Sequence, residues 1–223
     1  MDTNIKRELL VYLSTYATEN KLHKIDTIAA DRTKHVTVVM EDIFQTHNAS
    51  AVVRSSDCFG VQDLYVIEKR NTFSPLNSVA KGSAKWVEFH NFKSTTSCFH
   101  DLKRQGYTVV ATSPHKRSIS LHELPIEKKV ALVFGTESVG LSKEALDLAD
   151  EFVTIPMFGF TESFNISVSV AVCLYDIMQR LRNSSFDWRL SEDELLDVKL
   201  AWVKQVVSGS EILEKKFLEE WAR

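Results

Sequence analysis

Two short stretches of this chain are almost wholly apolar: VTVVM at 36–40 and VALVF at 130–134. Strands buried on both faces of a parallel sheet have such continuous apolar runs, whereas half-exposed strands alternate between apolar and polar residues. Further strands are expected at 63–68, 86–89, 107–112 and 151–155, with helical patterns between them at about 47–60, 94–105, 142–149 and 163–182. This alternation predicts an α/β fold with a mainly parallel sheet, helices on both faces and right-handed crossovers.

The two ends of the chain have a different pattern. Residues 4–18 and 20–34 have apolar side chains at helical spacing, and 187–223 is a charge-rich segment with two further helical patterns. A length of 223 residues suits one α/β domain with helical additions. We therefore expect an N-terminal helical extension at 1–34, a central domain at 35–182 and a C-terminal helical extension at 183–223.

Composition and simple sequence patterns exclude several classes of protein. No apolar run is long enough to cross a bilayer and the N-terminus has no secretory pattern, so we expect a cytoplasmic protein. Cys58, Cys98 and Cys173 are an odd number without a C-x-x-C pair, which favours reduced, buried thiols. The seven histidines include no i, i+4 pair, so no metal site is expected. Because the net charge is −3, a nucleic acid would have to bind a local basic patch.

Arg54 is the least expected residue of the helical segment HNASAVVRSSDCFG at 47–60. Its neighbours are mostly small or apolar, so the helix is predicted to be buried, and a guanidinium keeps its charge in every environment. A local ion pair with Asp57, three residues further on, is one explanation. The other is that Arg54 binds an external anion such as a phosphate, near Asn48, which stands at the expected N-cap of the helix.

A second segment, VFGTESVGLS at 133–142, has the glycine spacing of a phosphate-binding loop. Leu141 stands in the lysine position, however, and Glu137 would repel a phosphate, so a nucleoside triphosphatase is disfavoured. Glycines at both ends of the turn, Gly135 and Gly140, allow close approach of a ligand to the backbone. An ordinary strand-to-helix turn is the alternative.

The third segment, IPMFGFTESFNIS at 155–167, joins a strand to the long apolar helix. Pro156 and Gly159 end the strand, and Ser163 or Asn165 can cap the helix. The free backbone N–H groups at such a helix start can bind an anion. A plain core helix with a good cap is the alternative.

Taken in order, the three segments resemble the motifs of the SpoU/TrmH family of SPOUT RNA 2'-O-methyltransferases: N-x5-R from Asn48 to Arg54, G-x-E-x-x-G at 135–140, and IPMFGFTESFNIS. The resemblance covers about 20–182, with Phe164 where the family usually has leucine. It implies a C-terminal deep trefoil knot, S-adenosylmethionine as the cofactor, and a homodimer whose interface includes the helix at 163–182. It also implies methyl transfer to a ribose 2'-hydroxyl, most closely that of guanosine 18 in the D-loop of tRNA.

The resemblance assigns residues to roles. Arg54 would orient an RNA phosphate and stabilise the developing alkoxide. The other polar catalytic positions would be Asn48, Glu137, Ser163 and Asn165. The cofactor would contact Thr112, Gly135, Ile155 and Phe164, largely through main chain.

RNA contacts are not expected from the tail at 183–223, because it has more acidic than basic residues. Contacts are expected instead from a set of basic residues elsewhere: Lys6, Arg7, Lys21, Lys24, Arg32, Lys34, Lys81 and Lys85. A ribosomal RNA target and a non-catalytic RNA-binding knot protein are open alternatives.

Overall fold

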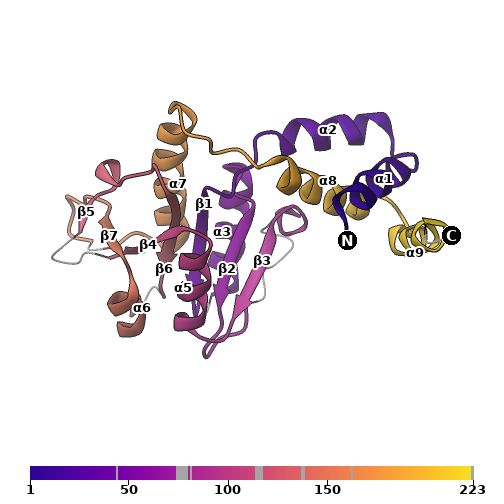
Figure 1. The fold of residues 1–223 in the computed structure, drawn as a ribbon. Coiled ribbons are helices and arrows are strands. Elements are labelled where there is room, and N and C mark those ends of the chain that lie inside the picture. Colours follow the sequence, from indigo (N-terminus) through magenta and orange to yellow (C-terminus); the bar gives the residue numbers. More distant parts are fainter. Residues whose placement is uncertain are drawn as a thin grey trace. The chain divides into compact units, whose positions relative to one another are not determined.

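The computed structural model describes residues 1–43, 45–73, 80, 82–113, 118–136, 139–161 and 163–221. Two compact units share these residues (Figure 1). One unit is the continuous stretch Thr33–Trp188, and the other combines Met1–Arg32 with Arg189–Arg223.

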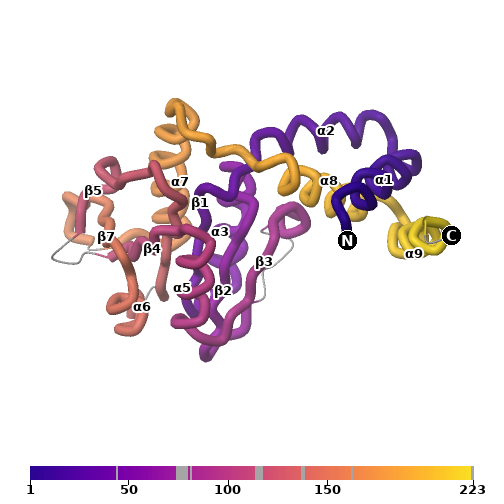
Figure 2. The backbone as a smooth tube through the Cα atoms, viewed as in Figure 1, coloured from indigo at the N-terminus to yellow at the C-terminus, as the bar shows by residue number. Residues whose placement is uncertain are grey.

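In the described part of the Thr33–Trp188 unit, the strands form one seven-stranded sheet in the order β3-β2-β1-β6-β4-β7-β5. Every neighbouring pair is parallel. The strands are β1 (Val36–Glu41), β2 (Asp63–Ile67), β3 (Glu88–Phe92), β4 (Tyr107–Thr112), β5 (Ile119–Ser120), β6 (Lys129–Phe134) and β7 (Glu151–Thr154). β1 and β6 are paired neighbours, although almost 90 residues separate them. Figure 2 shows β1, β2 and β3 in this order across one half of the sheet. The predicted α/β fold class is confirmed.

Helices cover both faces of this sheet. Val38 and Met40 of β1 pack toward α3 (Thr46–Cys58) and α7 (Ile166–Arg182), whereas Val39 packs toward α5 (Thr95–Arg104) and α6 (Lys143–Leu148). All six residues of β1 and all five of β2 are buried, because a parallel strand between two helical layers has no solvent-exposed face. Two short 3-10 turns, η1 (Ser83–Lys85) and η2 (Leu121–Glu123), complete the unit.

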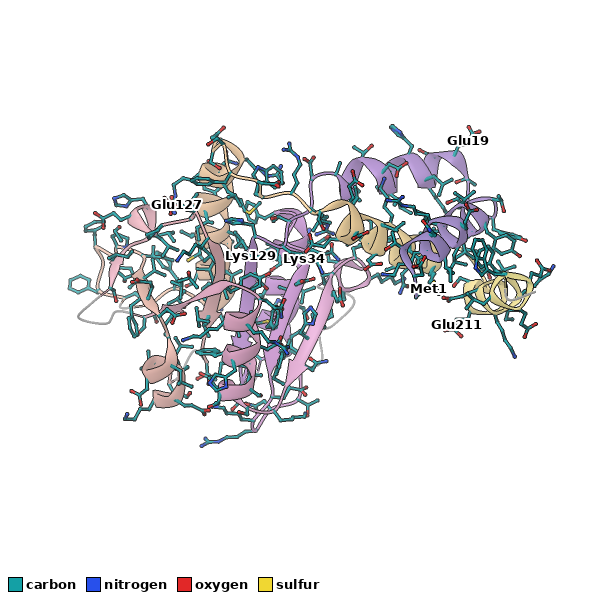
Figure 3. All side chains as sticks on the ribbon, in the orientation of Figure 1. Met1, Glu19, Lys34, Glu127, Lys129 and Glu211 are labelled. Atoms are coloured by element: carbon teal, nitrogen blue, oxygen red, sulfur yellow. The ribbon has the colours of Figure 1, made fainter. Side chains whose placement is uncertain are left out.

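The strands place their carboxyl ends along one edge of the sheet. Lys34 and Lys129, labelled in Figure 3, lie at the opposite, amino edge, where β1 and β6 begin. In open α/β sheets, ligands bind outside the carboxyl ends of the strands, so that edge is where a site is sought.

The second unit brings the first and last parts of the chain together. Helix α1 (Thr3–Ser14) packs against α8 (Glu192–Val206) and α9 (Ser210–Trp221), and α2 (Glu19–Ala29) packs against α8. Arg32, expected to contact RNA, is instead 1% exposed, with its guanidinium over the ring of Trp202. That prediction is wrong, because Arg32 is buried against Trp202 and does not present its charge to a nucleic acid.

Element bounds predicted from the sequence agree with most of the structure. The strand expected at 86–89 begins two residues later, because Trp86 still belongs to the end of η1. The two-residue strand β5 was not predicted. Among the described residues, no helix is both long and apolar enough to cross a bilayer. Cys58 is exposed rather than buried, unlike Cys98 and Cys173.

Candidate functional site

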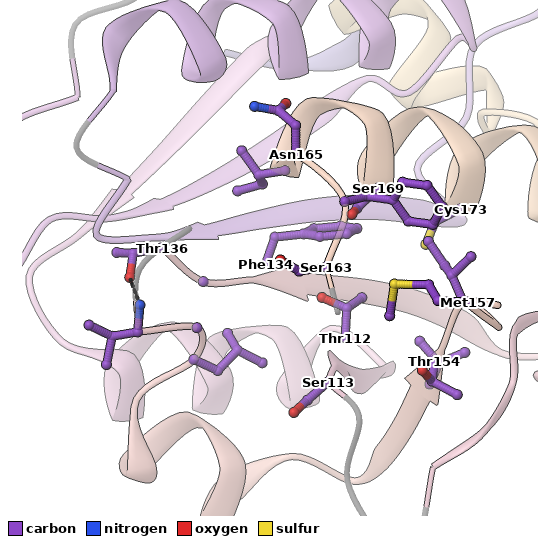
Figure 4. A pocket seen from close by; sticks show the side chains of 18 of the residues that line it. Thr112, Ser113, Phe134, Thr136, Thr154, Met157, Ser163, Asn165, Ser169 and Cys173 are labelled. Atoms are coloured by element: carbon purple, nitrogen blue, oxygen red, sulfur yellow. Dashed lines mark hydrogen bonds between the residues drawn. The ribbon is translucent and has the colours of Figure 1, made fainter. Parts of the chain in front are cut away.

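A cavity of about 550 Å³ lies at the carboxyl ends of β4, β6 and β7. Figure 4 shows Thr112, Met157 and Ser163 around it. Three chain segments form the walls: the end of β4, the turn after β6, and the connection from β7 into α7. The lining residues are Thr112, Ser113, Phe134, Gly135, Thr136, Val139, Gly140, Leu141, Leu146, Val153, Thr154, Ile155, Met157, Ser163, Phe164, Asn165, Ile166, Ser169 and Cys173.

The turn after β6 closes tightly on itself. Thr136 N–H donates to the Gly140 carbonyl at 3.1 Å, and Gly140 N–H donates back to the Thr136 carbonyl at 2.8 Å. A Cβ on Gly135 would lie 2.2 Å from the carbonyl carbon and oxygen of Gly140, and Gly140 itself has φ +74°. The close approach that was predicted for a ligand is therefore made, at Gly135, by the turn's own backbone.

Asn165 begins α7 at the mouth of the cavity. Its Oδ1 accepts hydrogen bonds from Ser167 N at 2.9 Å and Ser167 Oγ at 2.6 Å, which confirms the predicted N-cap. Its Nδ2 donates to Asn48 Oδ1 at 3.3 Å, so the first and third sequence motifs meet here. Asn48 is not the N-cap of α3, because the helix already begins at Thr46 and Gln45 takes that place.

The described wall of the cavity carries no charged side chain. Its polar groups are mainly hydroxyls, and Thr112 donates its own to the Val133 carbonyl at 2.7 Å. Burial raises the pKa of the Cys173 thiol to about 12, so this wall residue stays protonated and unreactive. A cavity whose described wall combines apolar side chains with carbonyl and hydroxyl oxygens suits a ligand that has both an apolar ring and hydrogen-bonding groups.

A polar cluster that the sequence analysis missed holds the glycine turn in place. Glu41, at the end of β1, accepts hydrogen bonds from Ser142 N at 2.9 Å, Ser142 Oγ at 2.7 Å and Thr95 Oγ1 at 2.5 Å. Lys69 Nζ lies 3.1 Å from Glu41 Oε1 and 2.8 Å from Glu144 Oε2. A carboxylate directly after a buried parallel strand was the signal that could have revealed this cluster.

The electrostatics of the cluster favour its ionised form. Burial alone would raise the pKa of Glu41, but the bonds from Thr95, Ser142 and Lys69 outweigh it and hold that pKa below its ordinary value. Hydrogen bonds from Lys69 and Thr96 lower the pKa of Glu144 to about 2. Since Ser142 follows Leu141 in the cavity wall, this cluster fixes one wall to the sheet.

The predicted site residues fall into four groups, of which Arg54 alone forms the last. Thr112, Gly135, Ile155 and Phe164, the predicted cofactor contacts, all line the cavity, as do Ser163 and Asn165. Asn48 is 6% exposed and joins them through Asn165. Glu137 lies outside the described residues.

Arg54 is not where the sequence suggested. It is exposed rather than buried, it does not line the cavity, and no described residue offers it a hydrogen-bond or ion-pair partner. Positions 47, 51, 54 and 58 form one stripe at helical spacing, and α3 turns this stripe away from the core. The stripe contains alanine and cysteine, so its sequence did not indicate a solvent-exposed face.

A separate ionisable cluster lies at the amino ends of β2 and β3. Asp63, Glu88 and His90 bring possible metal-ligand atoms within 4.8 Å of one another. Lys34 Nζ already lies 3.2 Å from Asp63 Oδ2 and 3.8 Å from Glu88 Oε2. Because this ammonium already contacts both carboxylates, and His90 Nε2 lies 3.7 Å from Asp63 Oδ2, the cluster is an ion-pair network.

Comparison with known proteins places the chain among RNA-modifying enzymes. The profile of the SpoU rRNA Methylase family matches residues 35–175. A Borreliella burgdorferi protein named tRNA (guanosine(18)-2'-O)-methyltransferase is 42% identical over 214 residues, which are 96% of this chain and 98% of that protein.

Two solved structures extend the comparison. The Aquifex aeolicus TrmH/SpoU tRNA modifying enzyme superposes with a TM-score of 0.76 at 29% identity, over 84% of this chain and 96% of that one. The SpoU methyltransferase AviRb from Streptomyces viridochromogenes, solved with AdoMet, has a TM-score of 0.62 at 22% identity, over 71% of this chain and 65% of that one. The second likeness supports the fold alone.

Proposed function

Because this chain belongs to the SpoU rRNA Methylase family, we propose that it transfers a methyl group from S-adenosylmethionine to the ribose 2'-hydroxyl of guanosine 18 in tRNA. The substrate follows the printed name of the Borreliella burgdorferi relative, to which the chain is similar along almost its whole length. The single observation in the structure that carries the proposal is the cavity at the carboxyl edge, whose described walls carry no charged side chain and come largely from the second and third sequence motifs.

The cavity fits the cofactor in size and character. Its volume of about 550 Å³ falls within the range of small-molecule sites, and its apolar floor suits an adenine ring. Gly135 and Ile155 would hold the cofactor chiefly through main-chain groups, and Thr112 and Phe164 would also contact it. When bound, S-adenosylmethionine supplies an electrophilic methyl group on a sulfonium, and no described wall residue carries a positive charge that would repel it.

The residues at the cavity mouth would act on the RNA. A ribose 2'-hydroxyl becomes a good nucleophile only as it loses its proton, and it must approach the methyl group in line. Asn165 and Ser163 are placed to orient the ribose, and Asn48 fixes the Asn165 side chain. The hydroxyl's proton would pass to an RNA phosphate or to water as the new O–C bond forms, while the bond between that methyl group and the sulfonium sulfur breaks and leaves S-adenosylhomocysteine.

In this proposal Arg54 binds the RNA, because its side chain is exposed on the single chain. Its guanidinium is available to a phosphate oxygen, for which its forked geometry is suited. It belongs to the same helix as Asn48 but points to another side. We propose that it positions the RNA backbone and stabilises negative charge on the 2'-oxygen, a role that an arginine fulfils better than proton abstraction.

We propose that the enzyme is a homodimer. Helix α7 has an exposed apolar stripe whose members are 37–61% exposed: Val168, Val172 and Tyr175. Their spacing of three and four residues places them on one helix face, and such contiguous apolar surface is typical of an interface. Because α3 packs against α7, the Arg54 stripe lies on the same side of the sheet and a second copy would partly cover it.

Three further expectations belong to the same proposal. The deep trefoil knot implied by the family resemblance, the absence of a catalytic metal and a cytoplasmic location stay predictions. None of them is needed for the methyl-transfer step as described.

The proposal is tested by incubating the purified chain with labelled S-adenosylmethionine and unmodified tRNA. Nuclease digestion and mass spectrometry are expected to find one 2'-O-methylguanosine at position 18. A matched tRNA that carries 2'-deoxyguanosine at that position is expected to accept no methyl group. Transfer to a base nitrogen, or to ribosomal RNA in preference to tRNA, would overturn the assignment.

A further inference from the structure

The connection from β7 into α7 carries two phenylalanines that the proposed methyl transfer does not use. Phe158 is 97% exposed and Phe160 is 109% exposed, the largest values among the exposed apolar residues of the described chain. Neither lines the cavity, although their neighbours Met157 and Ser163 do. Two fully solvent-exposed phenyl rings are unusual on a folded protein, because burying a ring is favourable by a few kcal/mol.

The position of the two rings relates them to the cavity mouth. The same segment lines the cavity on both sides of them, through Ile155 and Met157 before and through Ser163 to Ile166 after. Gly159 separates the rings, and a Cβ there would meet nothing closer than 4.0 Å, so the space around the segment is open. Phe158 and Phe160 therefore belong to the segment that an RNA would meet when its ribose reaches this mouth.

The chemistry of the segment indicates what it can bind. Residues 155–165 contain no lysine or arginine, so they offer no cationic side chain to a phosphate. What they offer is aromatic faces, and unstacked bases of single-stranded RNA loops bind to aromatic faces without sequence preference. The spacing of Phe158 and Phe160 also differs from the three- and four-residue spacing of the stripe on α7, which is the surface assigned to the second copy.

We infer that Phe158 and Phe160 form a stacking platform for nucleobases of the RNA substrate next to the ribose being methylated. This inference rests on the proposed function, because it needs an RNA at the cavity mouth. The rings would hold a splayed base by its π-face, and that contact would fix the position of the adjoining ribose over the cavity. RNA affinity would then come partly from stacking, which suits a chain of net charge −3.

The test compares three double variants of both rings with the wild-type chain. Phe→Tyr at 158 and 160 keeps the aromatic faces, Phe→Leu keeps apolar bulk without a π-face, and Phe→Ala removes both. Affinity for unmodified tRNA is measured by fluorescence anisotropy with S-adenosylhomocysteine present, together with calorimetry for S-adenosylhomocysteine and sedimentation velocity. These readouts do not require methyl transfer, so failure of the proposed function would be seen separately in the wild-type activity assay.

The expected result is a loss of tRNA affinity of at least about fivefold for the Leu and Ala variants, with the Tyr variant close to wild type. Cofactor affinity and the sedimentation coefficient are expected to stay unchanged in all three. The inference is overturned if the Leu variant binds tRNA like the wild type. It is also overturned if the Ala variant changes oligomeric state or cofactor affinity, because the rings would then belong to a protein interface or to the cofactor site.

Discussion

Replacing Gly135 with alanine tests how the cavity wall is built. The new Cβ would lie 2.2 Å from two backbone atoms of Gly140, about 1.2 Å short of the 3.4 Å at which ordinary contact begins. Backbone atoms cannot rotate away as a side chain can, so the turn must open. The two hydrogen bonds between Thr136 and Gly140 would then be lost.

The size of the effect follows from those contacts. Two backbone hydrogen bonds contribute about 1–3 kcal/mol together, so the free energy of unfolding is expected to fall by that amount. Displacing the wall by about 1 Å is expected to lower methyl transfer about 100-fold, because catalysis depends on in-line geometry. Urea denaturation measures the first quantity, and labelled methyl transfer to tRNA measures the second.

Gly159→Ala is the matched control, because its Cβ meets no atom closer than 4.0 Å and its turn can stay closed. It is expected to unfold like the wild type and to bind S-adenosylhomocysteine with unchanged affinity. If Gly135→Ala also matched the wild type in stability and in cofactor affinity, the tight turn would not be what shapes the cavity.

Three further predictions concern the remaining groups. Arg54→Ala is expected to lower methyl transfer about 100-fold or more while S-adenosylhomocysteine affinity, measured by calorimetry, stays unchanged; equal loss of both would place Arg54 at the cofactor instead. Val172→Glu is expected to convert the dimer to a monomer in sedimentation velocity, since it puts a charge into the α7 stripe; an intact dimer would assign the interface elsewhere. Glu144 has a folded-state pKa of about 2 against an ordinary 4.5, so its ionised form contributes stability above 4.5 that is lost as the pH falls toward 2. The difference in unfolding free energy between wild type and Glu144→Gln should therefore shrink over that range, and a constant difference would contradict the role of Glu144.

Local sequence patterns predicted the sheet well because its strands are buried on both faces. The runs at 36–40 and 130–134 have no other stable environment, so strands β1 and β6 were found within one residue of their ends. The bounds of strand β3 were harder to predict, since it lies at the sheet edge with Glu88 and Asn91 exposed and lacks such an apolar run. Two-residue β5 has no periodicity to detect.

The sequence predicted those cavity-lining residues that belong to one continuous motif. It did not predict the groups whose positions depend on tertiary contacts. Gly135 and Phe164 line one cavity because both follow strands that end at the same edge of the sheet. Arg54 was misplaced because alanine and cysteine hide the outward stripe of α3. The bonds of Glu41 to Thr95 and Ser142 join residues 54 and 101 positions apart, and no local pattern records them.

The central claim is that the cavity at the carboxyl edge of β4, β6 and β7 holds the methyl donor. A crystal structure of the chain with S-adenosylhomocysteine tests it most directly. The account predicts ligand density inside the cavity, in contact with Thr112, Gly135 and Phe164. Density at any other place on the chain, with this cavity empty, would contradict it.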